Sequence, residues 1–385
     1  MRYFIYFLVM VAFIDNFAQL PIISPFAQGL GGTPLLIGLA VGVYSFSNII
    51  GNILAGLWID KDGAKRVLYI GLGVTGLILL IYTFVSTPIQ LIIMRFLHGF
   101  SAGFLVPAAF TYLANRLDEG NKGKSMAISG AIVGVAAIIG PAFGGIMTAT
   151  VGITWVFLII GVVMILTALL TFAILPQIDT KTSRRLDDNN SWKSIVGLLK
   201  RIPLFYAYLG SFALMFSQGI LAYMLPLKVK LLNGGTEVSG MLMSTFALTA
   251  ILIFILPTNR LFDRFPHENT LNLGLGILGT SLFFLSLSAN IGYMYGVMVL
   301  YGIGFALIFP SMNALIAQHT NELERGKAFG LFYAFFSIGV VFGSIFTGAL
   351  AVTPDQAFII GTVLVLVSCM ILLFLIWRQQ KVRLR

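Results

Sequence analysis

The chain has 385 residues, of which 58% are hydrophobic and only 10% are charged. Soluble domains carry about 25% charged residues, so the composition excludes an ordinary water-soluble protein and indicates lipid as the main solvent. The formal net charge of +10 could suggest a nucleic-acid partner, but the placement of the basic residues along the chain argues against one.

Glycine, proline and charged residues divide the sequence into twelve apolar stretches, each long enough to cross a bilayer as a helix. The alternating pattern of a membrane barrel is absent, so we expect helices. A polar segment, 176–202, follows the sixth stretch, and its part from Trp192 to Leu199 predicts an amphipathic helix on the membrane surface. The twelve stretches cover about residues 3–28, 35–59, 66–86, 89–114, 124–148, 153–175, 203–228, 237–259, 268–289, 291–318, 326–350 and 355–377.

The basic residues are distributed unequally between the two sides of these spans. Of the 24 Lys and Arg residues, 21 fall on one side, Lys228 and Lys230 fall on the other, and Arg95 lies inside a span. Basic residues gather on the cytoplasmic side of membrane proteins. We therefore expect a multi-pass protein of the cell membrane with both termini and the segment 176–202 in the cytoplasm, and no nucleic-acid partner.

The sequence repeats itself with an offset of 203 residues. Rare residues recur in register, namely Gly99 and Gly302, Pro107 and Pro310, and Gly140 and Gly343. A two-fold repeat in a helical membrane protein is typical of transporters with a central site. We predict an all-α membrane protein with two pseudo-symmetric six-helix bundles, 1–175 and 203–385, joined by the linker 176–202.

The loop after the second span combines glycines with charged residues, namely Gly56, Asp60, Lys61, Gly63, Lys65 and Arg66. This loop resembles the signature loop between the second and third helices of the major facilitator superfamily. The resemblance implies the twelve-helix major facilitator fold and a latch that holds the two halves together when the outside is open. A simple positive-inside turn is the alternative. A degraded second copy contains Asp263 and Arg264.

Two more motifs resemble those of the same superfamily. The fourth span carries Arg95 followed by His98 and Gly99, which is similar to the family's fourth-helix motif, although glutamine is more usual than His98. The fifth span carries a Gly-Pro-x-x-Gly-Gly run that resembles the motif of drug/proton antiporters, where it is associated with export. Ordinary packing of small residues is the alternative. The run consists of Gly140, Pro141, Gly144 and Gly145.

The first span places Asp15 before Pro21 and Pro25. This pattern resembles the first helix of tetracycline efflux proteins and vesicular monoamine transporters, which belong to the twelve-helix drug/proton antiporter branch. Asp15 and Arg95 are the charged residues expected inside spans, with Lys228 near the outer end of the seventh. Intramembrane charges are usually functional.

Burial favours the neutral form of a carboxyl group, whereas a nearby arginine favours the charged form. We therefore hypothesise that Asp15 carries a proton, that Arg95 tunes it, and that His98 is a further candidate for a proton relay. Two alternatives remain open. Asp15 and Arg95 could form a static ion pair that fixes helix packing, or Asp15 could be the counter-ion of a cationic substrate.

Other polar side chains are candidates for lining a central substrate cavity, and each is equally compatible with a hydrogen bond between helices. They are Asn16, Gln19, Asn48, Asn52, Gln218, Tyr223 and Asn313. Gln218 lies at the repeat position of Asp15, so the second half has a neutral residue where the first has an acid.

The sequence contains no phosphate-binding loop, zinc pattern or nucleophile motif. We expect neither catalytic residues nor a metal or cofactor, and therefore no enzyme. The leading hypothesis is a monomeric, proton-coupled exporter that works by alternating access, with a small organic or amphipathic molecule, protons and membrane lipids as its partners. The alternatives are a proton-coupled uptake symporter and a flippase for a lipid-linked or amphipathic molecule.

Overall fold

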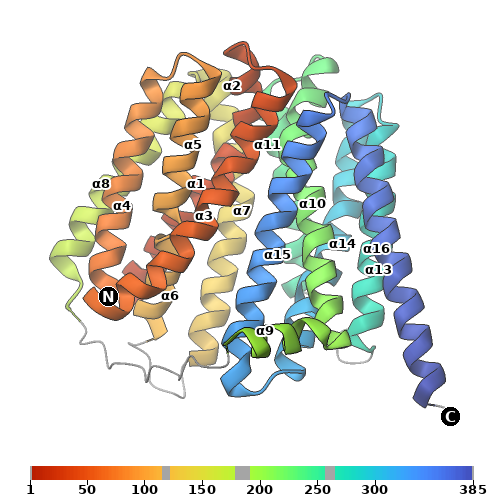
Figure 1. Ribbon diagram of the computed structural model, residues 1–385. Helices are drawn as coiled ribbons and strands as arrows, with labels where there is room; N and C mark the ends of the chain where they lie inside the picture. Colours follow the sequence, from red (N-terminus) through yellow and green to blue (C-terminus); the bar gives the residue numbers. More distant parts are fainter. Residues whose placement is uncertain (1, 115–121, 178–190, 256–264, 384–385) are drawn as a thin grey trace. The chain divides into compact units, whose positions relative to one another are not determined.

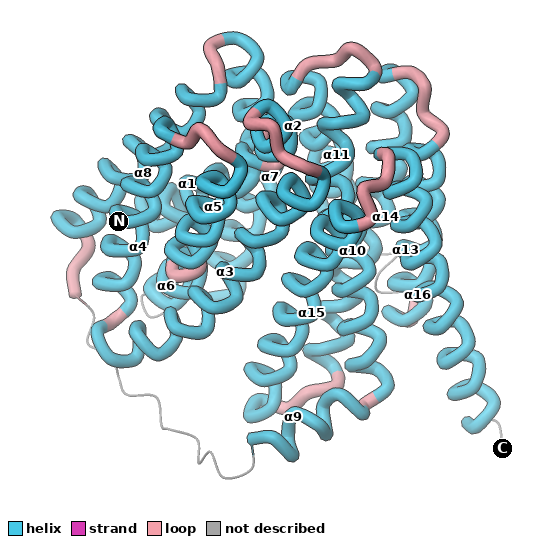
Figure 2. Tube along the Cα trace, turned by 45° about the horizontal axis from the view of Figure 1, so that its top comes forward, coloured by secondary structure: helices cyan, strands magenta, loops and turns pink. Residues whose placement is uncertain are grey.

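The computed structural model describes residues 2–114, 122–177, 191–255 and 265–383. Within these ranges the regular elements are helices connected by short turns (Figures 1 and 2). They are α1 (Arg2–Gln19), α2 (Ile23–Gly29), α3 (Pro34–Asp62), α4 (Ala64–Ile81), η1 (Tyr82–Phe84), α5 (Pro88–Ala102), α6 (Leu105–Ala114), α7 (Lys122–Thr150), α8 (Ile153–Ile174), α9 (Ser191–Lys200), α10 (Ile202–Leu231), α11 (Thr236–Ile255), α13 (His267–Ser286), α14 (Ile291–Gln318), α15 (Glu322–Ala349) and α16 (Pro354–Arg383).

The expected all-α membrane fold is confirmed. Among the described residues, 11 spans are long and apolar enough to cross a membrane, or 12 when the bent pair α1 and α2 counts as one. The fourth span is also interrupted, because α5 ends at Ala102 and α6 begins at Leu105. The helix expected near Trp192 to Leu199 is present as α9, whereas its place on the membrane surface stays a prediction.

The first span differs from the continuous helix expected from its hydropathy. It bends by 45° between α1 and α2. Pro21 lies inside this break, where it lacks a backbone N–H and disfavours helical geometry at Leu20. The turn is instead closed by the backbone N–H of Ile22, which donates to the carbonyl oxygen of Gln19 at 3.2 Å. The break therefore begins directly after Gln19.

Local sequence signals explain the other helix ends near the site. Thr87 caps α5 by accepting a hydrogen bond from the backbone N–H of Gln90, and the Gln90 side chain accepts from the Thr87 N–H in return. This reciprocal cap satisfies two donors that the first turn leaves free. Between α3 and α4, Gly63 has a φ of 84°, a conformation that favours glycine.

By their contacts, the described residues fall into two compact units. The first contains Met1–Arg185 and Val229–Ser244. In this unit α3 packs along α5, α4 along α8 and α1 along α7. A Cβ atom added to Gly99 would overlap the carbonyl oxygen of Tyr44, so glycine allows the close approach of α5 to α3. This contact positions the functional side chains of α5.

The second unit contains Leu186–Lys228 and Thr245–Arg385. Here α13 packs along both α14 and α16. Near the end of α10, the Nζ atom of buried Lys228 donates to the carbonyl oxygens of Leu285 at 2.7 Å and Ser286 at 3.2 Å, and pairs with Asp355 Oδ1 at 2.5 Å. The expected bundles 1–175 and 203–385 stay a prediction.

Candidate functional site

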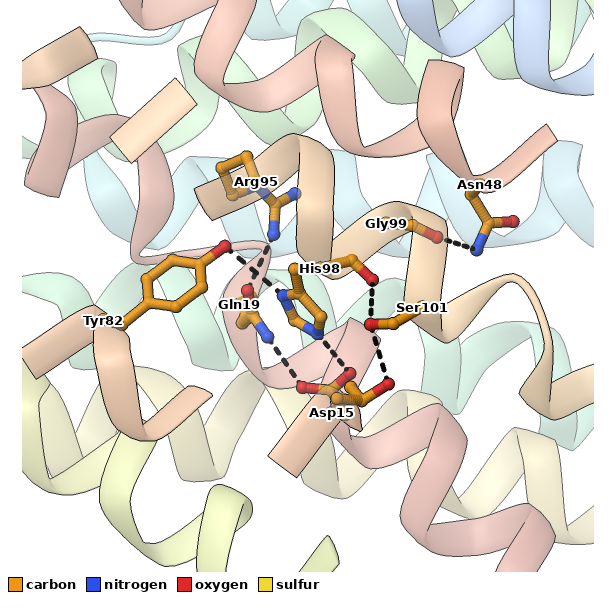
Figure 3. A network of polar contacts seen from close by, with 9 residues as sticks. Asp15, Gln19, Asn48, Tyr82, Arg95, His98, Gly99 and Ser101 are labelled. Carbon is orange, nitrogen blue, oxygen red and sulfur yellow. Dashed lines mark hydrogen bonds and ion pairs between the residues drawn. The ribbon is translucent and has the colours of Figure 1, made fainter. Parts of the chain in front are cut away.

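A buried carboxylate–imidazole pair connects α1 with α5 in the first unit. The Oδ2 atom of Asp15 lies 2.9 Å from the Nε2 atom of His98. Both side chains are completely buried, with 0% of their surface exposed. An unpaired charge at such a place would be very costly, so this pair is the strongest candidate for a functional centre (Figure 3).

Gln19 links this pair to Arg95. Its Nε2 atom donates to Asp15 Oδ1 at 2.7 Å, and its Oε1 atom accepts from Arg95 Nη1, also at 2.7 Å. The acid and the arginine therefore communicate through one amide group, as Figure 3 shows. The sequence placed Asp15 and Arg95 as neighbours, and the structure joins them through Gln19.

The guanidinium group of Arg95 is held from a second side by α3. Its Nε atom donates to the carbonyl oxygen of Ala40 at 3.0 Å, and its Cζ atom lies 4.4 Å from the centre of the Tyr44 ring. Arginine can serve a carbonyl group, an amide and an aromatic face at once because its guanidinium is planar and carries five donors. These contacts keep a charge inside the unit without a direct carboxylate partner.

Aromatic rings and hydroxyl groups surround the imidazole of His98. The Tyr82 hydroxyl lies 3.4 Å from Nδ1, and the ring of Tyr44 meets the imidazole edge-on at 5.1 Å. One turn further along α5, Ser101 donates to the His98 carbonyl at 3.0 Å and accepts from Thr75 at 2.9 Å. Tyr82 of η1 and Tyr44 of α3 therefore contact the ring itself, while Thr75 of α4 supports the main chain of His98 through Ser101.

The positions of these atoms accommodate a proton in more than one arrangement. When Asp15 is ionised, His98 donates through Nε2–H, and Nδ1 accepts from the Tyr82 hydroxyl. When Asp15 is protonated, its O–H donates to Nε2, and Nδ1–H donates to the Tyr82 oxygen. The same positions of the carboxyl, imidazole and hydroxyl groups can therefore hold an extra proton when the directions of these two hydrogen bonds are reversed.

The glycine motif of α7 packs directly against α1. A Cβ atom at Gly140 would lie 2.7 Å from Cβ of Phe17, and one at Gly144 would overlap the carbonyl oxygen of Ala18. Pro141 lies within this helix, and Gly145 faces the backbone of Thr236, whose hydroxyl donates to its carbonyl at 3.0 Å. The motif thus packs closely against α1 up to Ala18, the residue before Gln19.

The other predicted cavity residues do not join this network. Asn48 donates to the carbonyl oxygen of Gly99 at 3.2 Å and accepts from Asn52 at 2.8 Å, which is a contact between helices. Asn313 donates to its own helix at the carbonyl oxygen of Phe309, at 2.8 Å. Their role in a substrate cavity stays a prediction, as it does for half-buried Asn16 and Gln218 and for buried Tyr223.

In the predicted latch loop, the described side-chain hydrogen bonds are made to Asp62, which the sequence did not single out. It accepts from Trp58 Nε1 at 2.7 Å and lies 3.5 Å from Arg66 Nη1. A Cβ atom at Gly56 would meet nothing within 4 Å in its own unit.

The latch function of this loop stays a prediction. The Nζ atom of Lys65 lies 5.6 Å from the centre of the Phe172 ring, while Asp60 and Lys61 are exposed residues in the last turn of α3. Asp263 and Arg264 lie outside the described residues.

The second unit keeps a helix-to-helix hydrogen bond at the repeat position of His98, but without charge. This position is Tyr301, whose hydroxyl lies 2.7 Å from Ser217 Oγ. Ser217 precedes Gln218, the repeat position of Asp15, and buried Met298 stands at the repeat position of Arg95. The Asp15–His98 pair therefore has no carboxylate–imidazole counterpart at its repeat positions in the second unit.

Comparison with known proteins matches the chain to one family along nearly its full length. The family model of the Major Facilitator Superfamily matches residues 5–235 and 207–385. An uncharacterized MFS-type transporter of Methanocaldococcus jannaschii is 26% identical over 336 residues, 86% of each chain. Multidrug resistance protein 2 of Bacillus subtilis is 24% identical over 349 residues, which cover 89% of this chain and 86% of the relative.

A third relative is the multi-drug resistance efflux pump PmrA of Streptococcus pneumoniae, 26% identical over 362 residues, which cover 89% of this chain and 88% of the relative. Among solved structures, the nucleoside transporter NupG has a TM-score of 0.79 at 16% identity and covers 97% of this chain and 98% of its own. A bacterial homolog of the human lysosomal transporter Spinster has a TM-score of 0.79 at 13% identity, with 97% and 95% covered. At these identities the structural likeness shows the fold.

Proposed function

Since the chain belongs to the Major Facilitator Superfamily, it is a multi-span membrane transporter of small molecules and not an enzyme, and we propose that it exports an organic or amphipathic molecule in exchange for protons. The observation that carries the proton coupling is the buried contact of Asp15 with His98 at 2.9 Å. It places two titratable groups where their protonation state controls the net charge of a buried network.

The arrangement favours a proton over a substrate as the direct ligand of Asp15. Its two carboxylate oxygens are engaged by Gln19 and His98, and its side chain is fully buried. A cationic substrate would have to displace one of these partners, whereas a proton needs no added space. The counter-ion hypothesis therefore requires a rearrangement that the proton hypothesis does not.

The network also argues against a merely static ion pair of Asp15 and Arg95. A static pair is best served by direct charge-assisted hydrogen bonds. Here a neutral amide separates the two charges, and an imidazole, which can itself exchange a proton, contacts the other carboxylate oxygen. Such an arrangement keeps the charge of Asp15 adjustable.

Two observations support export as the direction. The Gly-Pro-x-x-Gly-Gly run of α7 is intact and packs tightly on α1 through Gly140 and Gly144. The relatives from Bacillus subtilis and Streptococcus pneumoniae are named as multidrug resistance or efflux proteins. The basic residues of the loops support a cytoplasmic location of both termini. We therefore propose that protons enter the cell as cargo leaves it.

The proposal is tested with the full chain in proteoliposomes under an imposed pH gradient. Ethidium serves as a cationic probe and chloramphenicol as a neutral one, and cargo flux and proton flux are recorded together. We expect the wild-type protein to move at least one probe against its gradient, opposite to the protons, and Asp15→Asn to lose this ability. Glu268→Gln makes the same chemical change in the first turn of α13 and should behave as wild type.

Three outcomes would overturn the proposal. If cargo and protons move in the same direction, the protein is an uptake symporter. If the flux of both probes ignores the pH gradient, or if Asp15→Asn retains gradient-driven transport with unchanged pH dependence, the proton-coupling role of Asp15 is wrong.

A further inference from the structure

Gln19 occupies a position that the sequence assigned to the substrate cavity, but its contacts suggest another task. Its side chain bridges Asp15 and Arg95, with both hydrogen bonds at 2.7 Å and only 1% of the residue exposed. Its main-chain carbonyl accepts the N–H of Ile22, the bond that closes the turn between α1 and α2. One residue thus joins the ionisable network to the break in the first span.

The orientation of the Gln19 amide is fixed by its partners. Arg95 carries only donors, so the oxygen end of the amide must face Arg95 and the nitrogen end must face Asp15. The N–H group donates to a carboxylate when Asp15 is ionised, and a charge-assisted hydrogen bond is roughly twice as strong as a neutral one. Protonation of Asp15 therefore weakens the hold on Gln19 and leaves the charge of Arg95 unbalanced.

The packing of α7 against α1 limits which part of the first span can move in response to this change. Gly140 and Gly144 of α7 lie against Phe17 and Ala18, with no space for a side chain between the helices. This close packing holds α1 up to the residue before Gln19. The segment that is not held in this way starts at Leu20 and contains the 45° bend.

From these contacts we propose that Gln19 is a positioning residue that passes the protonation state of Asp15 to the α1–α2 break. When Asp15 is ionised, the bridge to Arg95 keeps Gln19 fixed and the span bent. When Asp15 takes up a proton, the bridge loosens and α2 changes its angle to α1. This inference rests on the proposed proton coupling and adds the element that moves first.

The groups that could titrate beside Asp15 and Gln19 belong to the same unit. α5 contributes His98 and Arg95, α3 contributes Tyr44, and η1 contributes Tyr82, which is an electrostatic neighbour of both Asp15 and Arg95. The described parts of α7 and α8 that pack on α1 carry no titratable side chain between 128 and 174, and α6 carries only Tyr112, whose hydroxyl donates to the carbonyl of Pro176 at 3.0 Å. Of these groups, Asp15 and His98 are the two in direct contact, at 2.9 Å.

The test measures the angle of α2 directly in the full-length protein. Cys369 is replaced by Ser, and spin labels are attached at Gly29→Cys, the exposed end of α2, and Ile89→Cys, which is 62% exposed in the first turn of α5. Distances are measured by pulsed electron resonance in lipid nanodiscs at mildly acidic and mildly alkaline pH. Complete closing of the 45° bend would move the end of the seven-residue α2 by about 8 Å.

We expect the label distance to shift by several Å with pH in the otherwise unchanged protein, and Asp15→Asn to fix it at its acidic value. Gln19→Met, which has a similar length but no amide, should abolish the shift and lower proton-driven efflux about tenfold or more, the effect of one charge-assisted hydrogen bond. Gln19→Asn keeps the amide, but its side chain is too short to make both hydrogen bonds. It should therefore also abolish the shift and lower efflux, which tests the proposal even if Gln19→Met folds poorly. Ser47→Ala, which removes another buried hydroxyl of this unit, should retain the shift.

The outcomes separate the two proposals. If Asp15→Asn abolishes the shift but both Gln19 variants retain it, Gln19 is not the coupling residue, although Asp15 remains the proton site. If the label distance is independent of pH while efflux depends on it, the α1–α2 break does not respond to the proton. If efflux itself is independent of pH, the proposed function fails first.

Discussion

The imidazole of His98 lies 2.9 Å from the carboxylate of Asp15, and neither side chain has any exposed surface. The two residues are 83 positions apart in the sequence and come from α5 and α1. Glycines allow α5 to approach α3 closely and α7 to approach α1 closely. A buried contact between two titratable groups is where a proton can alter the stability of a conformation most directly.

We expect Arg95→Lys to be a severe change although it keeps the positive charge. Lysine offers a single ammonium group and cannot hold the Ala40 carbonyl, the Gln19 amide and the Tyr44 ring together. The loss of one buried hydrogen bond should lower the free energy of unfolding by about 1–3 kcal/mol. Thermal unfolding in detergent measures this effect, and wild-type stability together with wild-type efflux would show that the guanidinium geometry is unimportant.

His98→Gln should separate positioning from proton transfer. Glutamine can still hydrogen-bond to Asp15 but cannot accept a proton near neutral pH. We expect the folded protein to remain stable while the dependence of efflux on pH loses one ionisation and the maximal rate falls about a hundredfold or more, the usual effect of losing one proton-transfer group. The measurement is the efflux rate over a series of pH values. An unchanged profile would mean that His98 only packs against its neighbours.

The lengths of the apolar stretches and the 203-residue repeat were sufficient to predict most of the fold. The spans follow from apolar length, and Asp15 and Arg95 were selected because charges inside such spans are rare. The sequence could not show that Gln19 joins them, because a bridge depends on how far two side chains reach across a helix interface. Tyr82 and Thr75 were missed for the same reason, since a hydroxyl on an apolar helix carries no signal of its own partner.

The break between α1 and α2 was also missed, although its cause is visible in the sequence. Pro21 was read as part of a motif and not as the end of a helix. A glycine in the sequence permits a close helix contact but does not require one, and a Cβ atom at Gly56 would meet nothing within 4 Å in its own unit. Gly144, in contrast, is placed where its α1 neighbour leaves no room.

Gly144→Ala tests the contact between α7 and α1. A Cβ atom there would overlap the carbonyl oxygen of Ala18, whereas one at Gly130 would meet nothing within 4 Å. Overpacking typically costs about 1–3 kcal/mol, so we expect Gly144→Ala to lower the unfolding temperature and the efflux rate, and Gly130→Ala to change neither. Equal behaviour of the two variants in thermal unfolding would contradict the close packing.

Lys228→Met tests the role of the buried lysine near the end of α10. The ammonium group serves the last carbonyls of α13 and the exposed carboxylate of Asp355. Its removal leaves buried acceptors without a donor, which costs about 1–3 kcal/mol. We therefore predict a lower unfolding temperature with an unchanged pH dependence of efflux. A shifted pH profile would instead place Lys228 in the proton pathway.

The central claim is that Asp15 binds the proton that drives transport. It is tested most directly by adding ethidium or chloramphenicol to purified protein in weakly buffered detergent and recording proton release with a pH indicator. The account predicts that binding of a transported probe releases protons from the wild-type protein and none from Asp15→Asn, while Glu268→Gln releases as much as wild type. Equal release from wild type and Asp15→Asn would contradict it.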